Sequence, residues 1–282
     1  LDRYPPQDVT VDRVVKKVGN AYQVEPRWAA EYRIEDRPDL GAIVRSQRAE
    51  PDLFFINDGH GHFAREPLAG PRFLDQQGRR LTAEPDYFTL AARFYDVNGD
   101  GAPDLYVCND FEDPDQFWLN DGKGTFRLVP ALALRESSNT CMSVDFGDVN
   151  RDGHVDFFTA DMMGMDRARR QREIATNTPL PKPVGLPAER QQWMRNMLQL
   201  NNGNGTFSDI GQLAGVARTD WSWSALIADL DLDGYKDMYV TNGIARDVTS
   251  QDYVAYLGSQ RTMLTATRDK KVDFIALTNA MT

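Results

Sequence analysis

The sequence has little of what several classes of protein depend on. It contains 2 cysteines and 3 histidines in 282 residues, no run of 18 apolar residues and no excess of basic residues, since the formal net charge is −10. The missing apolar run argues against a membrane span. The acidic balance argues against nucleic acid or an anionic membrane as a partner.

The two cysteines, Cys108 and Cys141, allow two states. A bridge between them would close a loop of about 33 residues and stabilise the fold by roughly 3 to 4 kcal/mol. Two buried free thiols are the other possibility, and the slightly favoured one.

The motifs of common enzyme classes are also absent. The sequence has no Ser/His/Asp order, no His-Glu-x-x-His and no glycine-rich phosphate loop. Acid–base chemistry by Asp, Glu or Tyr stays open, but binding is favoured over catalysis.

One acidic pattern occurs three times in the same register. Oxygen-bearing residues stand at relative positions 1, 3, 5 and 9, a glycine follows at position 6, and position 7 offers its main-chain carbonyl. The candidate ligands are Asp96, Asn98, Asp100, Ala102 and Asp104 in loop one, Asp148, Asn150, Asp152, His154 and Asp156 in loop two, and Asp229, Asp231, Asp233, Tyr235 and Asp237 in loop three. Such a set suits a hard cation that takes 6 to 8 oxygens, so about three Ca²⁺ sites are predicted.

Position 12 separates this pattern from an EF-hand, which needs a bidentate Glu there and a helix on each side. The three loops have Val107, Thr159 and Val240 instead, within β-branched and aromatic runs that favour a strand. Each loop is therefore expected to join two strands. Three bound Ca²⁺ ions would add six positive charges and bring the formal charge from −10 to −4.

A second recurring element is an Asn-Asp-Gly or Asn-Asn-Gly turn between apolar alternations, at residues 57–63, 120–126 and 201–207. This turn chemistry is the strongest short-range hairpin signal, because a tight turn needs φ > 0. The loop and the hairpin together predict four antiparallel strands per repeat, which describes a propeller blade. Small residues in the strand before each loop, such as Ala91, Ser143 and Ser224, fit a position near a crowded central axis. A β-sandwich with long loops is the alternative.

These motifs resemble FG-GAP/VCBS repeats, the calcium-binding blades of integrin α-subunit propellers and of many bacterial secreted proteins. Residues 195–207, with Trp221 and Trp223 before loop three, are similar to bacterial VCBS proteins of the ASPIC/UnbV group. The resemblance covers about residues 53–243. It implies a secreted, periplasmic or cell-surface module for adhesion or for binding a glycan or extracellular protein. A polysaccharide lyase or hydrolase on the same scaffold is the alternative.

The repeats are incomplete at both ends, because the first hairpin has no loop before it and the third loop has no hairpin after it. Three blades are too few to close a ring when about 4 to 8 are usual, so an open arc is favoured over a closing seam. The expected divisions are residues 1–50, where Trp28, Tyr32 and Ile34 would share a strand face, blades over 51–243, and a helical tail over 244–282. The first residues form no signal peptide and are not typical of a natural start, so the chain is expected to be mature or cut from a longer one.

An insertion at about residues 161–194 has a basic, helical start and a proline-rich loop. Long loops on rigid scaffolds concentrate binding residues. An ordinary solvated face is the favoured interpretation of its charges. In the functional alternative, Arg167, Arg169, Arg170 and Arg172 receive an acidic ligand, and the insertion is free of strand pairing.

Overall fold

The computed structural model describes residues 14–19, 21–37, 42–110, 113–173 and 190–244. Strands predominate in these stretches, as the all-β prediction requires, and the one α-helix among them is α2 (Arg167–Glu173). None of the described helices is long and apolar enough to cross a membrane. The predicted helical tail falls, from residue 245 on, outside the described residues.

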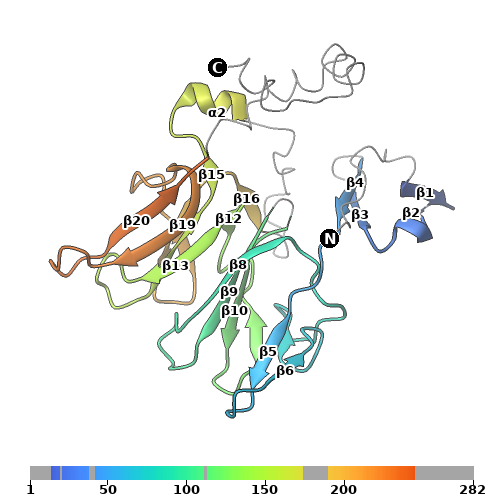
Figure 1. The fold of residues 1–282 in the computed structure, drawn as a ribbon, viewed down its shortest axis with the longest axis horizontal. Coiled ribbons are helices and arrows are strands. Elements are labelled where there is room, and N and C mark those ends of the chain that lie inside the picture. Colours follow the sequence, from blue (N-terminus) through green and yellow to red (C-terminus); the bar gives the residue numbers. More distant parts are fainter. Residues whose placement is uncertain (1–13, 20, 38–41, 111–112, 174–189, 245–282) are drawn as a thin grey trace.

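Two four-stranded antiparallel blades form the centre of the fold (Figure 1). Blade 1 consists of β8 (Thr89–Tyr95), β9 (Asp104–Asn109), β10 (Gln116–Asn120) and β11 (Phe126–Leu128). Blade 2 consists of β13 (Ser143–Gly147), β14 (Asp156–Ala160), β17 (Met197–Asn201) and β18 (Phe207–Asp209). The predicted order of strand, acidic loop, strand and hairpin is confirmed in both.

In the described residues, the third repeat forms half a blade. Half-blade 3 consists of β19 (Asp220–Ala228) and β20 (Asp237–Asn242), paired antiparallel. The short strand β15 (Met162–Met163) pairs with the other edge of β19. Within the described part of the chain, no strand pairs with the outer edge of β20.

The predicted hairpin turns are confirmed, and all three have the same register. Asn120 pairs with Phe126 across the β10–β11 turn, and Asn201 pairs with Phe207 across the β17–β18 turn. The first hairpin, which we call the N-terminal hairpin, joins β5 (Phe54–Asn57) to β6 (Phe63–Glu66) and pairs Asn57 with Phe63. Both glycines of each turn have positive φ, from +71° at Gly203 to +89° at Gly61.

The strands that precede the acidic loops lie side by side in the interior of the arc. Strand β13 packs between β8 and β19 (Figure 1). The backbone N–H of Ala225 in β19 donates to the Oγ of Ser143 in β13 at 3.1 Å. A hydrogen bond of this kind requires β13 and β19 to approach each other closely. This is the physical reason for the small residues predicted at these positions.

Aromatic and aliphatic side chains fill the two interfaces between blades. Between blades 1 and 2, the ring of Phe157 packs against Tyr106 and Phe207, with centroids 5.0 Å and 5.2 Å away. Between blade 2 and half-blade 3, Phe158, Leu198 and Ala225 form a buried cluster. Each second strand thus sends alternate residues to opposite neighbours, as its period of two requires.

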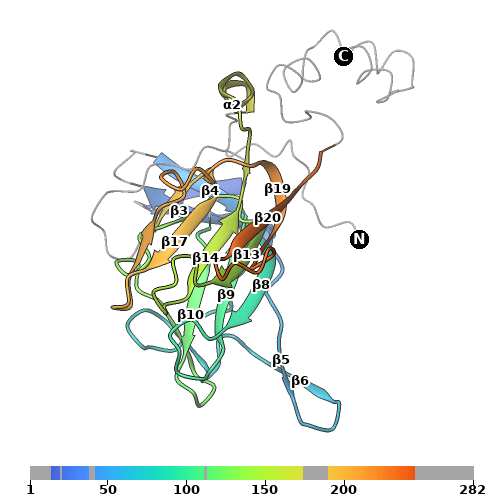
Figure 2. The ribbon, with the colours of Figure 1, turned by 90° about the vertical axis from the view of Figure 1, so that its left-hand side faces the viewer.

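The described blades form an open arc, and no closed propeller is seen among them. At the blade 1 end, β7 (Phe73–Leu74) adds a parallel strand to β11. The N-terminal hairpin forms a separate two-stranded sheet and projects from the body (Figure 2). It lies far along the arc from half-blade 3, so it does not complete that half-blade within the chain.

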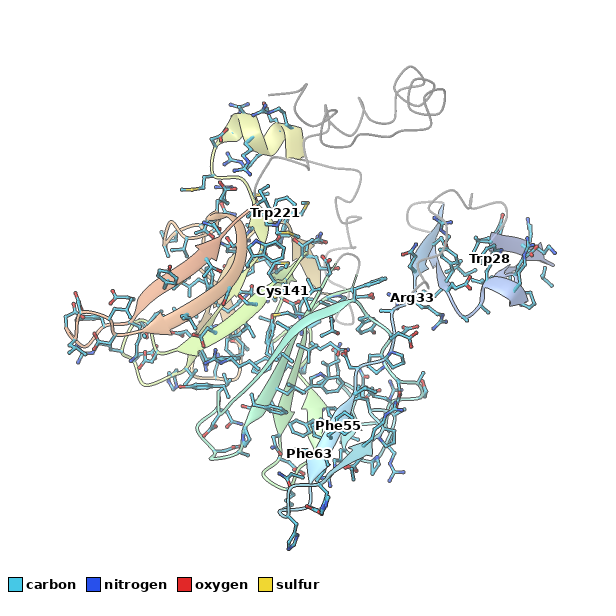
Figure 3. The ribbon with its side chains drawn as sticks, in the orientation of Figure 1. Trp28, Arg33, Phe55, Phe63, Cys141 and Trp221 are labelled. Atoms are coloured by element: carbon cyan, nitrogen blue, oxygen red, sulfur yellow. The ribbon has the colours of Figure 1, made fainter. Side chains whose placement is uncertain are left out.

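The described residues between 14 and 50 form two further hairpins and no blade. They are β1 (Val15–Val18) with β2 (Ala21–Val24), and β3 (Tyr32–Arg37) with β4 (Ala42–Gln47). The shared strand face predicted here is wrong for Trp28, which lies in the 3₁₀ turn η1 (Pro26–Trp28), where Pro26 favours a turn start. Arg33 connects the segment to the rest through an ion pair with Asp86 at 2.8 Å (Figure 3).

Both ends of the insertion are held by strand pairing, so the expectation that it is free of pairing is wrong there. Besides β15, strand β16 (Gln191–Trp193) runs parallel to β12 (Glu136–Ser138). The predicted helical start is confirmed as α2. Residues 174–189, with the proline-rich loop, lie outside the described residues.

Candidate metal-binding loops

The three acidic loops occupy equivalent places in three consecutive repeats. Residues 96–104 connect β8 to β9, residues 148–156 connect β13 to β14, and residues 229–237 connect β19 to β20. In each loop the position-9 aspartate, which is Asp104, Asp156 or Asp237, is the first residue of the second strand. Each loop is therefore flanked by two paired strands, which fix the positions of its two ends.

Two positions of each loop have left-handed backbone. The predicted glycine at position 6 has φ of +85° at Gly101, +87° at Gly153 and +91° at Gly234. Position 4, which the sequence pattern missed, has φ of +75° at Gly99 and +62° at both Arg151 and Leu232. The sequence indicates this left-handed position only weakly, because loop one alone has a glycine at position 4.

Replacing Leu232 with glycine is expected to stabilise the calcium-free chain. A non-glycine residue in the left-handed region costs roughly 1 to 2 kcal/mol, and glycine loses roughly 0.5 to 1 kcal/mol more entropy on folding. Leu232 is 85% exposed, so little packing is lost. We expect Leu232→Gly to raise the unfolding free energy in denaturant melts by about 0.5 to 1 kcal/mol.

Gly99→Leu is the matched control, since it places leucine at the same position of loop one. A Cβ there would meet no atom within 4 Å, so the change adds backbone strain without a clash. It is expected to destabilise by a similar amount. A stabilising effect of Gly99→Leu would show that backbone strain does not govern this position.

Main-chain hydrogen bonds shape the loops around their carboxylates. The position-1 aspartate accepts the N–H of the position-6 glycine at 2.9 Å in loops one and two and 3.0 Å in loop three. The position-5 aspartate accepts the N–H of position 7 at 2.8 Å in all three loops. These bonds direct the acidic side chains inward over the loop.

The position-9 carboxylates tie the loops to the hairpins. Asp104 accepts the N–H of Val97 at 3.0 Å on one oxygen and that of Asn120, the first turn residue of the hairpin, at 2.8 Å on the other. Asp156 does the same with Val149 at 2.9 Å and Asn201 at 2.8 Å. Each carboxylate oxygen keeps a second lone pair with which it can bind a cation.

Burial makes these carboxylates costly to ionise without a cation. Asp104 is 1% exposed and Asp156 is fully buried. Burial raises the pKa of Asp104 to about 6, although two backbone N–H groups act against the shift, and the charges of Asp100 and Asp96 raise it further. Burial also raises the pKa of Asp156. A bound divalent cation would favour the ionised form of both.

Loop three brings its carboxylates together most closely. Asp229, Asp231 and Asp237 each place an oxygen within 4.8 Å of the others, the one group of this kind in the described part of the chain. One oxygen of Asp229 is buried without a hydrogen-bond partner. In loops one and two the neutral position-3 residue instead donates to the position-5 carboxylate, from Asn98 to Asp100 at 3.0 Å and from Asn150 to Asp152 at 2.9 Å.

The sequence model of the FG-GAP-like repeat matches residues 96–159 and 190–240. The first match spans loops one and two with the hairpin between them, and the second spans the next hairpin and loop three. The matches support the FG-GAP/VCBS repeat family that the motifs predicted, and the gap between them coincides with most of the insertion. They do not extend to the ASPIC/UnbV group. No curated protein matches the chain.

Asp145 in β13 joins the three inner strands, and no sequence motif pointed to it. Its Oδ1 lies 2.9 Å from Nη1 of Arg93 in β8, and its Oδ2 accepts the N–H of Ile227 in β19 at 2.7 Å. The residue is 2% exposed. A single carboxylate therefore links both blades and the half-blade near the centre of the arc.

A second buried group surrounds Asp115, between blades 1 and 2. Asp115 accepts the O–H of Tyr106 and the N–H of Asn109, both at 2.9 Å. Burial raises the pKa of Asp115 to about 7. Arg190 donates to the main-chain carbonyls of Asp115 and Leu134, both at 2.6 Å, which anchors the end of the insertion.

The two cysteines are free and buried, as the favoured alternative had it. Cys141 is labelled in Figure 3. Burial raises the pKa of both thiols. Both side chains are fully buried, so neither is a reactive surface thiol. They belong to the packing between blades 1 and 2.

The four arginines proposed to receive an acidic ligand are not equivalent. Arg169 pairs with Asp220 at 2.5 Å, and Arg170 donates to the carbonyl of Met165 at 2.5 Å. Both are half-buried, whereas Arg167 and Arg172 are exposed. The functional hypothesis for the insertion therefore rests on Arg167 and Arg172.

Proposed function

We propose that the chain is a calcium-binding β-propeller module of an extracellular protein, and that it binds a glycan or a protein ligand. The observation that carries the proposal is the recurrence of one oxygen-rich loop at the same place in three consecutive repeats. The close carboxylates of Asp229, Asp231 and Asp237 add to it. FG-GAP-like repeats suggest such a repeat-based extracellular binding module.

Calcium fits the donor set better than other cations. The candidate ligands are carboxylate, amide and carbonyl oxygens, with no cysteine and with His154 offering only its carbonyl. Hard oxygen donors in a flexible loop suit Ca²⁺, whereas Mg²⁺ requires a near-ideal octahedron and retains its water. The loops would hold the ion and brace the two inner strands of each repeat.

Loop three is expected to bind calcium most tightly, because it offers four carboxylates where loops one and two offer three. Asp233→Ala should remove the tightest step from a calorimetric calcium titration. Asp152→Ala, at the same position of loop two, is the matched control and should remove a weaker step. Loss of the weakest step in Asp233→Ala would mean that loop geometry outweighs charge.

Two surfaces are candidates for the ligand. One is a pocket of about 340 Å³ beside blade 2, whose lining includes Arg135, Glu136, Gln199 and Asn202. Glu136 is held in place by Arg195 at 3.0 Å. A concave site with amide, hydroxyl and charged groups suits a hydroxyl-rich ligand. The other surface is the exposed face of α2, with Arg167 and Arg172.

A glycan and matrix-protein binding screen, with and without calcium, tests the proposed function. Arg135→Ser should weaken binding if the pocket holds the ligand. Arg167→Ser with Arg172→Ser should weaken binding and reduce its salt dependence if α2 holds an acidic ligand. Calcium titrations of both variants should match the parent chain. Absence of calcium-dependent binding across the screen would contradict the proposed function.

A further inference from the structure

Two of the three histidines stand in one tight turn, at the tip of the N-terminal hairpin. Residues 57–63, of which Phe63 is labelled in Figure 3, read Asn-Asp-Gly-His-Gly-His-Phe, so that His60 and His62 each follow a glycine. The corresponding residues are Lys123 and Thr125 in the blade 1 turn, and Asn204 and Thr206 in the blade 2 turn. The turn itself therefore does not require histidine at either position.

The backbone of this tip is held by Asp58, in the way that Asp121 holds the blade 1 turn. The Oδ1 atom of Asp58 accepts the backbone N–H of His60 at 2.7 Å and that of His62 at 3.2 Å. Asp121 accepts the two equivalent N–H groups at 2.8 Å and 3.0 Å. Because Oδ1 of Asp58 is used by the backbone, Oδ2 is left to bind a side chain.

Asp58 also holds the side chains of both histidines. The Nδ1 atom of His62 lies 3.0 Å from Oδ2 of Asp58, and the Nδ1 atom of His60 lies 3.1 Å from the main-chain carbonyl oxygen of Asp58. An ionised carboxylate and a carbonyl oxygen can only accept, so each Nδ1 carries a proton and donates it. The lone pair of each neutral ring is therefore on Nε2.

This arrangement is the one that metal-binding histidines use. A histidine that binds a metal ion through one ring nitrogen donates its other N–H to a carboxylate or a backbone carbonyl, which fixes the tautomer and orients the ring. Asp58 supplies both kinds of acceptor. The side chains of His60 and His62 are 84% and 83% exposed, so packing does not prevent either Nε2 from turning toward a shared ion.

We infer that the tip of the N-terminal hairpin binds one divalent transition-metal ion through Nε2 of His60 and of His62, with Asp58 as the positioning residue. Zinc, copper and nickel ions suit imidazole nitrogen, whereas the hard calcium ion takes oxygen ligands. This site and the acidic loops therefore select different metals. Two protein ligands leave coordination positions open to water or to a donor group of a partner.

Calorimetric titration of the untagged full chain with Zn²⁺, in excess calcium, tests the site. We expect a zinc step of one ion per chain at the tip. The double variant His60→Lys with His62→Thr gives the tip the residues of the blade 1 turn. It should lose this step and keep the far-ultraviolet spectrum of the wild-type chain.

An unchanged zinc step in the double variant, or no zinc step in the wild-type chain, would overturn the inference. Zinc bound by the acidic loops would persist in the double variant, so it cannot be mistaken for zinc at the tip. Calcium titration is read separately. The tip site and the proposed calcium sites can therefore fail independently of each other.

Asp58→Asn tests the positioning role. Asn202 has the same place in the blade 2 turn, so the turn accepts asparagine there. The amide NH₂ that replaces Oδ2 would donate to Nδ1 of His62, which moves the ring proton to Nε2 and removes the lone pair that binds the metal. We expect zinc affinity to fall by about 10- to 100-fold. The ¹⁵N imidazole spectrum of the metal-free chain should show the change of tautomer at His62.

Asp121→Asn makes the same change in the blade 1 turn and is the matched control. It should alter neither the zinc affinity nor the imidazole spectrum. Wild-type zinc affinity in Asp58→Asn would contradict the positioning role of Asp58. A proton on Nε2 of His62 in the metal-free wild-type chain would overturn the assigned ligand atom.

Discussion

Removal of calcium with EDTA is expected to lower the melting temperature by more than about 10 °C. A ligand at 100 times its dissociation constant adds about 2.7 kcal/mol per site, and one kcal/mol corresponds to about 2 to 4 °C in a chain of this size. Three filled sites therefore predict a large shift. The physical cause is the repulsion among three or four carboxylates in each loop, which the cation relieves.

Calorimetric melts in calcium, in EDTA and in magnesium measure this effect. Magnesium is the control for ionic strength and charge, and it should restore little of the lost stability because the loops do not impose a small octahedron. Equal melting temperatures in calcium and EDTA would contradict a structural role for calcium. Equal melting temperatures in calcium and magnesium would contradict the choice of ion.

The second large effect is expected for Asp161→Ala, where the insertion leaves blade 2. Asp161 is fully buried and accepts hydrogen bonds from the hydroxyls of Ser138 and Thr140 and from the N–H groups of Asn139, Thr140 and Met162. Each buried donor left without a partner costs about 1 to 3 kcal/mol. We expect a loss of about 3 to 5 kcal/mol in the unfolding free energy.

Urea unfolding of the variant and its control checks this expectation. Glu84→Ala is the control, because Glu84 forms a surface ion pair with Arg65 at 3.1 Å and its loss should cost no more than about 1 kcal/mol. Asp161→Asn should fall between the two, since an amide keeps one acceptor oxygen but turns two N–H donors toward other donors. If Asp161→Ala were as mild as Glu84→Ala, the buried network would have no role in stability.

Local features were predictable because their causes lie within about a dozen residues. Asp229 through Asp237 form one loop whose glycine, carboxylates and following strand stand at consecutive positions. The turn at Asn120 and Gly122 likewise carries its own backbone preference. The same local logic missed Arg151 and Leu232, because neither residue type favours the left-handed backbone that the repeat requires of it.

The buried charges were not predictable in this way. Asp145 meets Ile227 at a separation of 82 residues, Arg190 meets Asp115 at 75, and Asp161 meets Ser138 at 23. Sequence spacing carries no information about such partners, because they meet only after the blades have packed. The insertion was read as free of pairing for the same reason, since β15 and β16 pair with strands far from them in the chain.

The sequence by itself thus determined the repeats: three acidic loops between strands, three Asn-Gly turns and the all-β class, all of which follow from short-range backbone and side-chain preferences. Only the tertiary structure decided how the repeats are joined. It placed Asp145 of β13 against Arg93 and Ile227 on the strands at either side, joined Asp104 to Asn120 by a hydrogen bond, and set β20 and the N-terminal hairpin at opposite ends of the arc. The physical reason is that packing between blades depends on side chains far apart in the chain, whereas each loop and turn is formed by its own neighbours.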